Sequence, residues 1–306
     1  MAPAKPLSLR PPLLLASVLL LASLASAQSR PKLKVFISAD MEGVAGVVTD
    51  QQLGPTGFEY AKFREIMTGE VLAAIEGARA AGATEILVAD SHGNGQNVLI
   101  DQLPADVQLV RSWPRPLGMM QGIDETFDAA VFIGYHTSTG NPTGVRAHSF
   151  SSATLADVRL NGEPVSEGAF NAAIAGHYGV PIVAVSGDDA VVAEIGRVVP
   201  GIEGAVVKWA YGFHSARTLT PKAATAEIRA KVQRGISRRA AVPVRRLSLP
   251  VTLEVRFKNY RPSEVLAYLP IVERVDSHTI RFTGRDIVEV SRFFSFLKDY
   301  QPDLSP

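Results

Sequence analysis

The stretch Lys34-Val-Phe-Ile-Ser-Ala-Asp-Met-Glu-Gly43 sets both the fold and the chemistry of this chain. Residues 34–39 are rich in Val, Phe and Ile with little alternation, which is typical of a strand buried on both faces of a parallel sheet. Two carboxylates, Asp40 and Glu42, follow this strand directly. Because ligands of parallel α/β sheets collect beyond the carboxyl ends of the strands, we expect both carboxylates to belong to a functional site.

The flanking segments predict a repeating order of strands and helices. Residues 58–81 carry apolar residues at helical spacing and stop at Gly82, which predicts a long helix. Further strands are expected at 85–90, 107–110, 129–134, 155–160 and 181–186, and a second helix, with Ser166 as its N-cap, at 167–178. We therefore expect an α/β fold with a mainly parallel sheet flanked by helices.

The composition changes after Pro200. A basic amphipathic helix is expected at 221–239 and an alternating strand at 251–257, followed by a short helix at 262–269, a strand at 279–282 and a closing helix at 286–300. This part predicts a smaller C-terminal α+β region. We expect a metal-binding catalytic domain over 28–205 and the smaller region over 206–306, with the boundary between 205 and 245.

Residues 1–27 are typical of a signal peptide. Lys5 and Arg10 precede an almost purely apolar run over 11–24, which closes on the small-x-small cleavage signal Ala25-Ser26-Ala27. The alternative is a membrane anchor, but the run is shorter than the ~20 residues that span a bilayer. We expect cleavage after Ala27, export to the periplasm or the medium, and no stable membrane insertion of the mature chain.

Composition excludes several classes of function. The chain has no cysteine, so neither a disulfide framework nor a thiol nucleophile is available. Its net charge is +1 with both signs mixed along the sequence, which leaves no electrostatic footprint for a nucleic acid. An apolar content of 46% is ample for a core.

Three expected strands end in side chains of the metal-ligand type: Asp40 and Glu42 after the first, His92 after the second, and His136 after the fourth. Each alone has an ordinary explanation as a helix cap or a satisfied polar residue. On an extended strand Asp40 and Glu42 share a face, and two carboxylates on one face repel unless a cation lies between them. Imidazoles with carboxylates form a set that zinc accepts, whereas calcium and magnesium favour all-oxygen shells.

Glu167, at the head of the second expected helix, offers a fifth ligand. Five ligands exceed the needs of one tetrahedral zinc ion. A carboxylate that bridges two metals would use them all, and such pairs, about 3.5–4 Å apart, activate a shared water in aminopeptidases and phosphatases.

A resemblance to the zinc D-aminopeptidases of the DppA type is carried by the motifs Ser38-Ala39-Asp40-Met41-Glu42-Gly43, Asp90-Ser91-His92, Gly134-Tyr135-His136, His148-Ser149, Glu167 and Gly187-Asp188-Asp189. It extends from residue 34 to at least 215. The resemblance implies two Zn²⁺ ions per subunit, bridged by Asp40, with Glu42 and His92 on one ion and His136 and Glu167 on the other. It also implies that His148 is the non-ligand catalytic residue, and that the subunits form a ring-shaped homo-oligomer.

We therefore expect an exported binuclear zinc aminopeptidase for short peptides with N-terminal D-residues such as D-Ala. The alternatives are a metal-dependent phosphoesterase or other amide hydrolase, and an exported metal- or peptide-binding protein without turnover. The sequence has no Gly-rich phosphate cradle and no Arg or Lys cluster beside the ligand motifs, which disfavours phosphoester chemistry. His148 favours turnover, because a pure binder has no use for a non-ligand histidine beside its metals.

The other polar residues of interest have simple expected roles. Asp90 is expected to contact a metal-bound histidine and orient its ring without binding the metal itself. Asp188 and Asp189 are expected either to cap a helix before Ala190 or to bind the substrate amine. Lys208 is expected to lie at the surface rather than to meet a substrate carboxylate. The histidines outside the motifs are expected at a helix end or at the surface: His177, His214 and His278.

Overall fold

The strand quoted first in the sequence lies in the interior of a seven-stranded sheet. In the computed structural model, which describes residues 1–4 and 32–300, β1 (Lys34–Ala39) pairs in parallel with β2 on one side and β4 on the other, and residues 35–39 are fully buried. The strand order is β3-β2-β1-β4-β7-β8-β9, with every pair parallel except β8–β9. The other members are β2 (Glu85–Asp90), β3 (Gln108–Val110), β4 (Ala129–Tyr135), β7 (Ile182–Asp188), β8 (Glu203–Gly212) and β9 (Ser215–Thr218).

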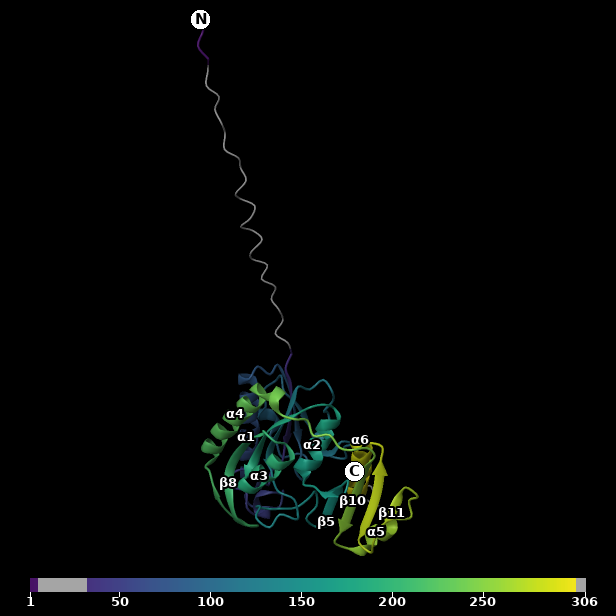
Figure 1. Ribbon diagram of the computed structural model, residues 1–306. Helices are drawn as coiled ribbons and strands as arrows, with labels where there is room; N and C mark the ends of the chain where they lie inside the picture. Colours follow the sequence, from purple (N-terminus) through teal and green to yellow (C-terminus); the bar gives the residue numbers. More distant parts are fainter. Residues whose placement is uncertain (5–31, 301–306) are drawn as a thin grey trace. The chain divides into compact units, whose positions relative to one another are not determined.

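Helices cover both faces of this sheet, as expected for parallel strands with right-handed crossovers. α1 (Tyr60–Ala80) and α4 (Pro221–Ser237) lie side by side on one face, and α2 (Glu167–His177) and α3 (Asp189–Val198) lie on the other (Figure 1). Gly77 lets α1 and α4 approach closely, because a Cβ there would lie 2.6 Å from the Arg229 carbonyl oxygen. Short 3-10 helices occupy the connections: η1 (Asp50–Gln52), η2 (Ile100–Gln102), η3 (Gly118–Met120) and η4 (Arg239–Ala241).

A second sheet has five strands, all antiparallel, in the order β11-β12-β10-β5-β6. It comprises β5 (Leu155–Leu160), β6 (Glu163–Pro164), β10 (Val251–Phe257), β11 (Val272–Arg274) and β12 (Thr279–Gly284), with the helices α5 (Tyr260–Leu266) and α6 (Ile287–Asp299). α6 joins the sheets: Phe293 stacks on Phe282 of β12 at 4.1 Å, and Phe294 contacts Phe170 of α2 at 5.4 Å.

The two sheets interleave along the sequence. β5 and β6 lie between β4 and α2 in the sequence but belong to the second sheet, where β5 pairs with β10 and β6 with β5, whereas β8, β9 and α4 belong with the parallel sheet. Residues 33–300 belong to one compact unit. Strand pairing, and not order in the chain, therefore assigns each segment to its sheet, and the expected boundary between 205 and 245 stays a prediction.

The architecture agrees with the predicted α/β class, and the strand at 251–257 has the expected bounds. Four strands were not predicted: the short β6 and β11, and β8 and β9 of the parallel sheet. β8 is masked in the sequence by Lys208, a charged residue in its middle. The expected signal peptide at 1–27 lies, apart from residues 1–4, outside the described residues. Within 1–4 and 32–300, none of the helices combines the length and the apolar character needed to cross a bilayer.

Candidate metal centre

The predicted ligands meet where the strand order reverses. From β1 the chain proceeds through β2 to β3 on one side, then returns to β4 on the other side and continues to β7. The carboxyl ends of β1, β2 and β4 therefore flank a topological switch point, where parallel α/β sheets bind ligands. Glycines allow close packing here: a Cβ at Gly43 would lie 2.0 Å from the Tyr135 carbonyl oxygen, and one at Gly134 2.2 Å from that of Asp40.

Asp40 occupies the middle of the site. Its Oδ1 lies 3.3 Å from His92 Nδ1, and its Oδ2 lies 3.4 Å from His136 Nε2. His92 Nδ1 is also 2.9 Å from Glu42 Oε2, and His136 Nε2 is 3.3 Å from Glu167 Oε1. Each oxygen of one carboxylate thus faces a different imidazole–carboxylate pair, and all five side chains are buried.

Backbone carbonyls fix the histidine rings. His92 Nε2 lies 2.7 Å from the Leu53 oxygen, and His136 Nδ1 lies 3.0 Å from the Thr137 oxygen. Because a carbonyl oxygen can only accept, these ring nitrogens carry the hydrogens, and His92 Nδ1 and His136 Nε2 are turned toward Asp40. Such outer contacts set the tautomer and orientation of metal-binding histidines.

Glu167 reaches the site from the first turn of α2. Ser166 caps this helix by accepting from the Ala169 N–H, so the carboxylate lies at the positive end of the helix dipole. The Phe150 N–H donates to Glu167 Oε1 at 2.7 Å and fixes its direction.

The pKa values of the clustered side chains are shifted by burial and by the charges of their neighbours. Burial and the neighbouring Glu42 raise the pKa of Asp40 to about 8. Burial disfavours the charged form of His136, but the Glu167 carboxylate more than offsets this and raises the pKa of His136 to about 10. Burial likewise works against ionisation of Glu42, yet the His92 imidazole holds the pKa of Glu42 well below its usual value. Three buried carboxylates therefore demand positive charge, which divalent cations satisfy by displacing protons from the ligands.

The donor atoms fit two zinc ions. Asp40 Oδ2 and His136 Nε2 are buried and have no hydrogen-bond partner among the described residues. Three groups of described residues have donor atoms within 4.8 Å of one another, and two of them, Asp40–Glu42–His92 and Asp40–His136–Glu167, share only Asp40. Imidazole nitrogens and carboxylate oxygens in such sets are donors that zinc accepts. The site therefore accommodates the division of ligands that the sequence resemblance implies.

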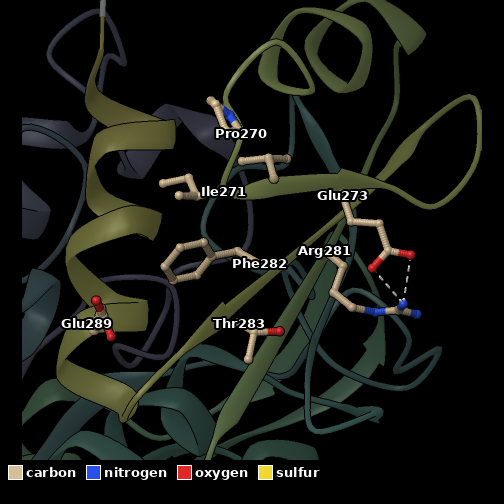
Figure 2. A pocket seen from close by; sticks show the side chains of 8 residues that line it. Pro270, Ile271, Glu273, Arg281, Phe282, Thr283 and Glu289 are labelled. Atoms are coloured by element: carbon tan, nitrogen blue, oxygen red, sulfur yellow. Dashed lines mark hydrogen bonds and ion pairs between the residues drawn. The ribbon is translucent and has the colours of Figure 1, made fainter.

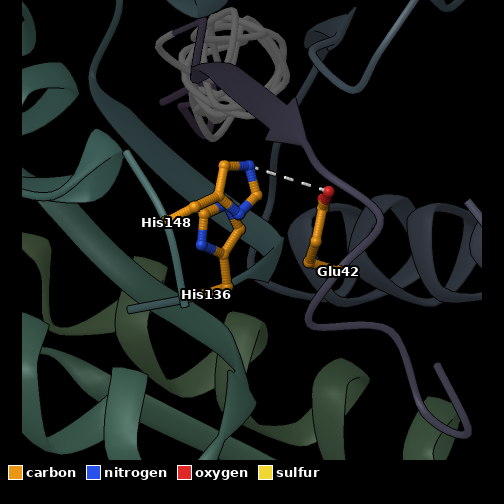
Figure 3. A group of neighbouring side chains, drawn as sticks. All are labelled: Glu42, His136 and His148. Atoms are coloured by element: carbon orange, nitrogen blue, oxygen red, sulfur yellow. Dashed lines mark ion pairs between the residues drawn. The ribbon is translucent and has the colours of Figure 1, made fainter. Parts of the chain in front are cut away.

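His148 lies against the edge of this cluster (Figure 3). Its ring stacks on that of His136 with the centroids 4.1 Å apart, and its Nε2 is 3.9 Å from Glu42 Oε1 and 3.8 Å from Glu167 Oε1. Its Nδ1 donates to the Arg146 oxygen at 2.8 Å, so in the neutral ring Nε2 carries no hydrogen. Burial and the adjacent His136 lower the pKa of His148, which favours this neutral form. The arrangement suits a proton acceptor, although donor distances also allow Glu42, His136 and His148 to form a third ligand group.

Asp90 differs from its expected role. Its carboxylate accepts from the backbone N–H groups of Asn97 and Val98 and from the Asn97 amide, at 2.5 to 2.9 Å. It therefore fastens the loop after β2, and the Leu53 carbonyl orients the His92 ring instead.

Asp188 has a structural role. Its Oδ1 caps α3 by accepting from Val191, and its Oδ2 accepts from Val145, both at 2.7 Å. Both oxygens are engaged, which leaves Asp188 poorly suited to bind a substrate amine. The helix-cap interpretation is confirmed. The exposed His177 ends α2, and His214 is exposed, as expected.

Two buried charges next to the site were not predicted as part of it. Lys208 of β8, expected at the surface, is fully buried, and its Nζ donates to the carbonyl oxygens of Glu42, Val44 and Val47. Glu70 of α1 is also fully buried and accepts from the Ala45 N–H at 2.9 Å. Both therefore hold the segment that follows β1.

We expect Glu70→Gln to flatten the pH dependence of folding stability. Burial raises the pKa of Glu70 from 4.5 to about 7, so between these values the folded chain keeps a proton that the unfolded chain releases. Stability therefore falls as pH rises through this window, by up to about 3 kcal/mol. Glutamine keeps the acceptor for Ala45 but does not titrate. Urea unfolding of chelator-treated protein at pH 5 and pH 7 measures the difference; Glu76→Gln, exposed on the same helix, should retain the wild-type slope. An unchanged slope in Glu70→Gln would contradict the assignment.

A surface groove of about 430 Å³ lies elsewhere, between β11, β12 and α6 (Figure 2). Its charged residues are paired: Arg281 Nη1 donates to both carboxylate oxygens of Glu273 at 3.1 and 3.0 Å. None of the clustered side chains lines this groove: Asp40, Glu42, His92, His136, His148 and Glu167. The candidate metal ligands thus lie at the sheet edge and not in this groove.

Comparisons with known proteins cover the whole site. The family model Peptidase_M55, described as D-aminopeptidase, matches residues 33–296. A D-aminopeptidase of Bacillus subtilis (strain 168) is 32% identical over 259 residues, which span 84% of this chain and 93% of that protein. The solved structure of the "Zn-dependent D-aminopeptidase DppA from Bacillus subtilis, a self-compartmentalizing protease" superposes with a TM-score of 0.84 at 29% identity, covering 87% of this chain and 97% of that one.

Proposed function

The chain belongs to the Peptidase_M55 family of D-aminopeptidases, and from this premise we propose that it is an exported binuclear zinc aminopeptidase for short peptides with an N-terminal D-residue, D-Ala peptides included. One observation carries the binuclear part of the proposal. The two oxygens of Asp40 face two separate imidazole–carboxylate pairs, which is the arrangement that a bridging ligand requires.

Asp40, Glu42, His92, His136 and Glu167 would hold the ions. Bound zinc supplies Lewis acidity toward the scissile carbonyl and makes water acidic enough to act as a nucleophile near neutral pH. The protein fixes these donors on strand ends and a helix terminus, so little reorganisation accompanies the reaction.

His148 would move the proton. In the tautomer that the Arg146 carbonyl selects, Nε2 is free to accept a proton from the attacking water and to return it to the leaving amine. The lowered pKa of His148 keeps this nitrogen available at neutral pH. The free α-amine of an aminopeptidase substrate is a cation, and the carboxylates of Glu42 and Glu167 are the groups at the site that can receive it, since Asp188 is engaged elsewhere.

The activity is tested by release of p-nitroaniline from D-Ala and L-Ala p-nitroanilides, with p-nitrophenyl phosphate as the rival substrate. We expect faster release from the D-Ala compound, complete loss after chelation, and recovery with added zinc. Release from the phosphate ester alone would refute the peptidase assignment. Zinc uptake without hydrolysis of any of the three would favour a binding protein.

Export and assembly are parts of the same proposal. The basic start, the apolar run and the Ala25-Ser26-Ala27 signal support cleavage before Gln28, which N-terminal sequencing of the protein recovered outside the cytoplasm would test. The solved relative is described as self-compartmentalizing, which supports a homo-oligomeric ring here. Exposed apolar side chains on α5 and the segment after it, Tyr260, Val265, Tyr268 and Ile271, offer a surface for subunit contact. Light scattering coupled to size exclusion measures the subunit number.

A further inference from the structure

The segment Asp40–Val47, called here the ligand loop, is held by hydrogen bonds within itself and to three other parts of the fold. It carries Asp40 and Glu42 and has no helix or strand. Its backbone N–H groups from 43 to 47 all donate: to Gly134 O at 2.7 Å, Met41 O at 3.1 Å, Glu70 Oε1 at 2.9 Å, Thr218 Oγ1 at 2.9 Å and Val44 O at 3.1 Å. The backbone amides of residues 43–47 are therefore satisfied without any ligand.

The carbonyl side of the loop converges on one cation. Lys208 Nζ donates to Val44 O at 3.1 Å and Val47 O at 2.7 Å, and also donates to Glu42 O. An ammonium has three hydrogens, and each has one acceptor here. The side chain is fully buried, so this ammonium has no access to solvent.

A buried ammonium is costly unless it is hydrogen-bonded and surrounded by opposite charge. Glu70, Asp188 and Glu42 supply negative charge around Lys208, and Arg146 is the nearby cation that opposes it. The same positive charge offsets repulsion within the buried carboxylates beside the loop. An apolar residue would fill β8 at lower cost, which points to a role for the charge beyond packing.

We propose that Lys208 is a positioning residue that holds the ligand loop in its metal-binding conformation before zinc arrives, so that Glu42 already faces His92. This inference rests on the proposed zinc function. It predicts that loss of Lys208 weakens the binding of the two zinc ions unequally. The Asp40 N–H donates to Ile133 O of β4 at 2.8 Å, so Asp40 stays anchored without Lys208, whereas the Glu42 carbonyl loses its partner.

Lys208→Met tests the inference through zinc affinity, measured by competition with a chromophoric chelator on protein shown to be folded by circular dichroism. We expect one of the two ions to bind about 10- to 100-fold more weakly, which is the usual effect of removing a residue that orients a metal ligand. The affinity for the second ion should change by only a few-fold. Lys34→Met, a partly buried lysine at the opposite end of β1, is the matched control and should bind both ions like the wild type. Wild-type affinity at both sites, or equal weakening of both, would overturn the proposal.

Chemical rescue separates charge from shape. Because the chain has no cysteine, Lys208→Cys introduces a single thiol. Alkylation of the unfolded variant with 2-bromoethylamine rebuilds an ammonium of nearly the same length, and alkylation with 2-bromoethanol gives a neutral side chain of similar size. After refolding, we expect the ammonium to restore tight binding of the weakened ion and the alcohol not to. Equal recovery with both reagents would overturn the role of the charge.

A measurement on the unaltered chain keeps the inference testable if the variants do not fold. Hydrogen exchange of amides 43–47 should be nearly as slow in chelator-treated wild type as in zinc-loaded protein, because Lys208 and Glu70 hold the loop without metal. Exchange at the rate of an unstructured segment after chelation would overturn the proposal. A wild type that binds no zinc would instead refute the proposed function, and the exchange result would still report on the loop.

Discussion

Asp40→Ala is expected to abolish binding of both zinc ions and to lower kcat/KM by about three orders of magnitude or more. Asp40 belongs to both ligand groups of the proposed binuclear site, Asp40–Glu42–His92 and Asp40–His136–Glu167, so its loss removes one donor from each and leaves both ions with two protein ligands. Metal catalysis contributes several kcal/mol to transition-state stabilisation, and each 1.36 kcal/mol is a factor of ten in rate. Zinc per chain by atomic emission and hydrolysis of the D-Ala anilide measure the two effects.

Asp101 is exposed, and Asp101→Ala serves as the control for the same substitution made away from the site. This variant should keep two ions per chain and the wild-type rate. Near-ultraviolet circular dichroism of both variants confirms that the core packing is intact. If Asp40→Ala kept one tightly bound zinc, the bridging role would be wrong, and Asp40 would be a ligand of a single ion.

His148→Ala is expected to keep two zinc ions and to lower kcat by about 10²- to 10⁴-fold, which is the usual contribution of a general acid or base. Its Nε2 lies 3.8 to 3.9 Å from the Glu167 and Glu42 carboxylate oxygens, its ring stacks on that of His136, and its Nδ1 donates to the Arg146 carbonyl. Substrate binding should change little, because the proposed amine contacts are carboxylates. Steady-state kinetics on the D-Ala anilide separate kcat from KM, and metal analysis of the same sample reports the ions.

His177→Ala, at the exposed end of α2, should match the wild type in both measurements. Loss of one zinc ion from His148→Ala would place this histidine among the ligands, in the group that it forms with Glu42 and His136.

The cluster could be predicted from the sequence because the end of a buried strand can be recognised from a short stretch of residues. A buried run followed by Asp40 and Glu42 is visible within ten residues, and the histidines follow equally legible strands. The parallel sheet then brings these ends to one edge, so no long-range pairing had to be known.

The contacts that orient the cluster leave no such signal. The Leu53, Thr137 and Arg146 carbonyls act through the backbone, which is the same for every residue type. Lys208 meets Glu42 across 166 residues of sequence, and a lone lysine is usually a surface residue. The strands at 155–160 and 251–257 were both predicted, but their pairing with each other could not be, because antiparallel pairing between distant segments has no local motif.

The interleaving of the two sheets makes the candidate metal centre depend on segments from both halves of the sequence. A fragment that ends at residue 205 would contain all six clustered side chains, yet it would lack Lys208 and would leave β5 without β10. Unpaired strand edges invite aggregation, so such a fragment should be insoluble. The site therefore cannot be expressed as an N-terminal module or grafted as one onto another protein. Recombination between relatives would preserve the site only if both sheets were exchanged together.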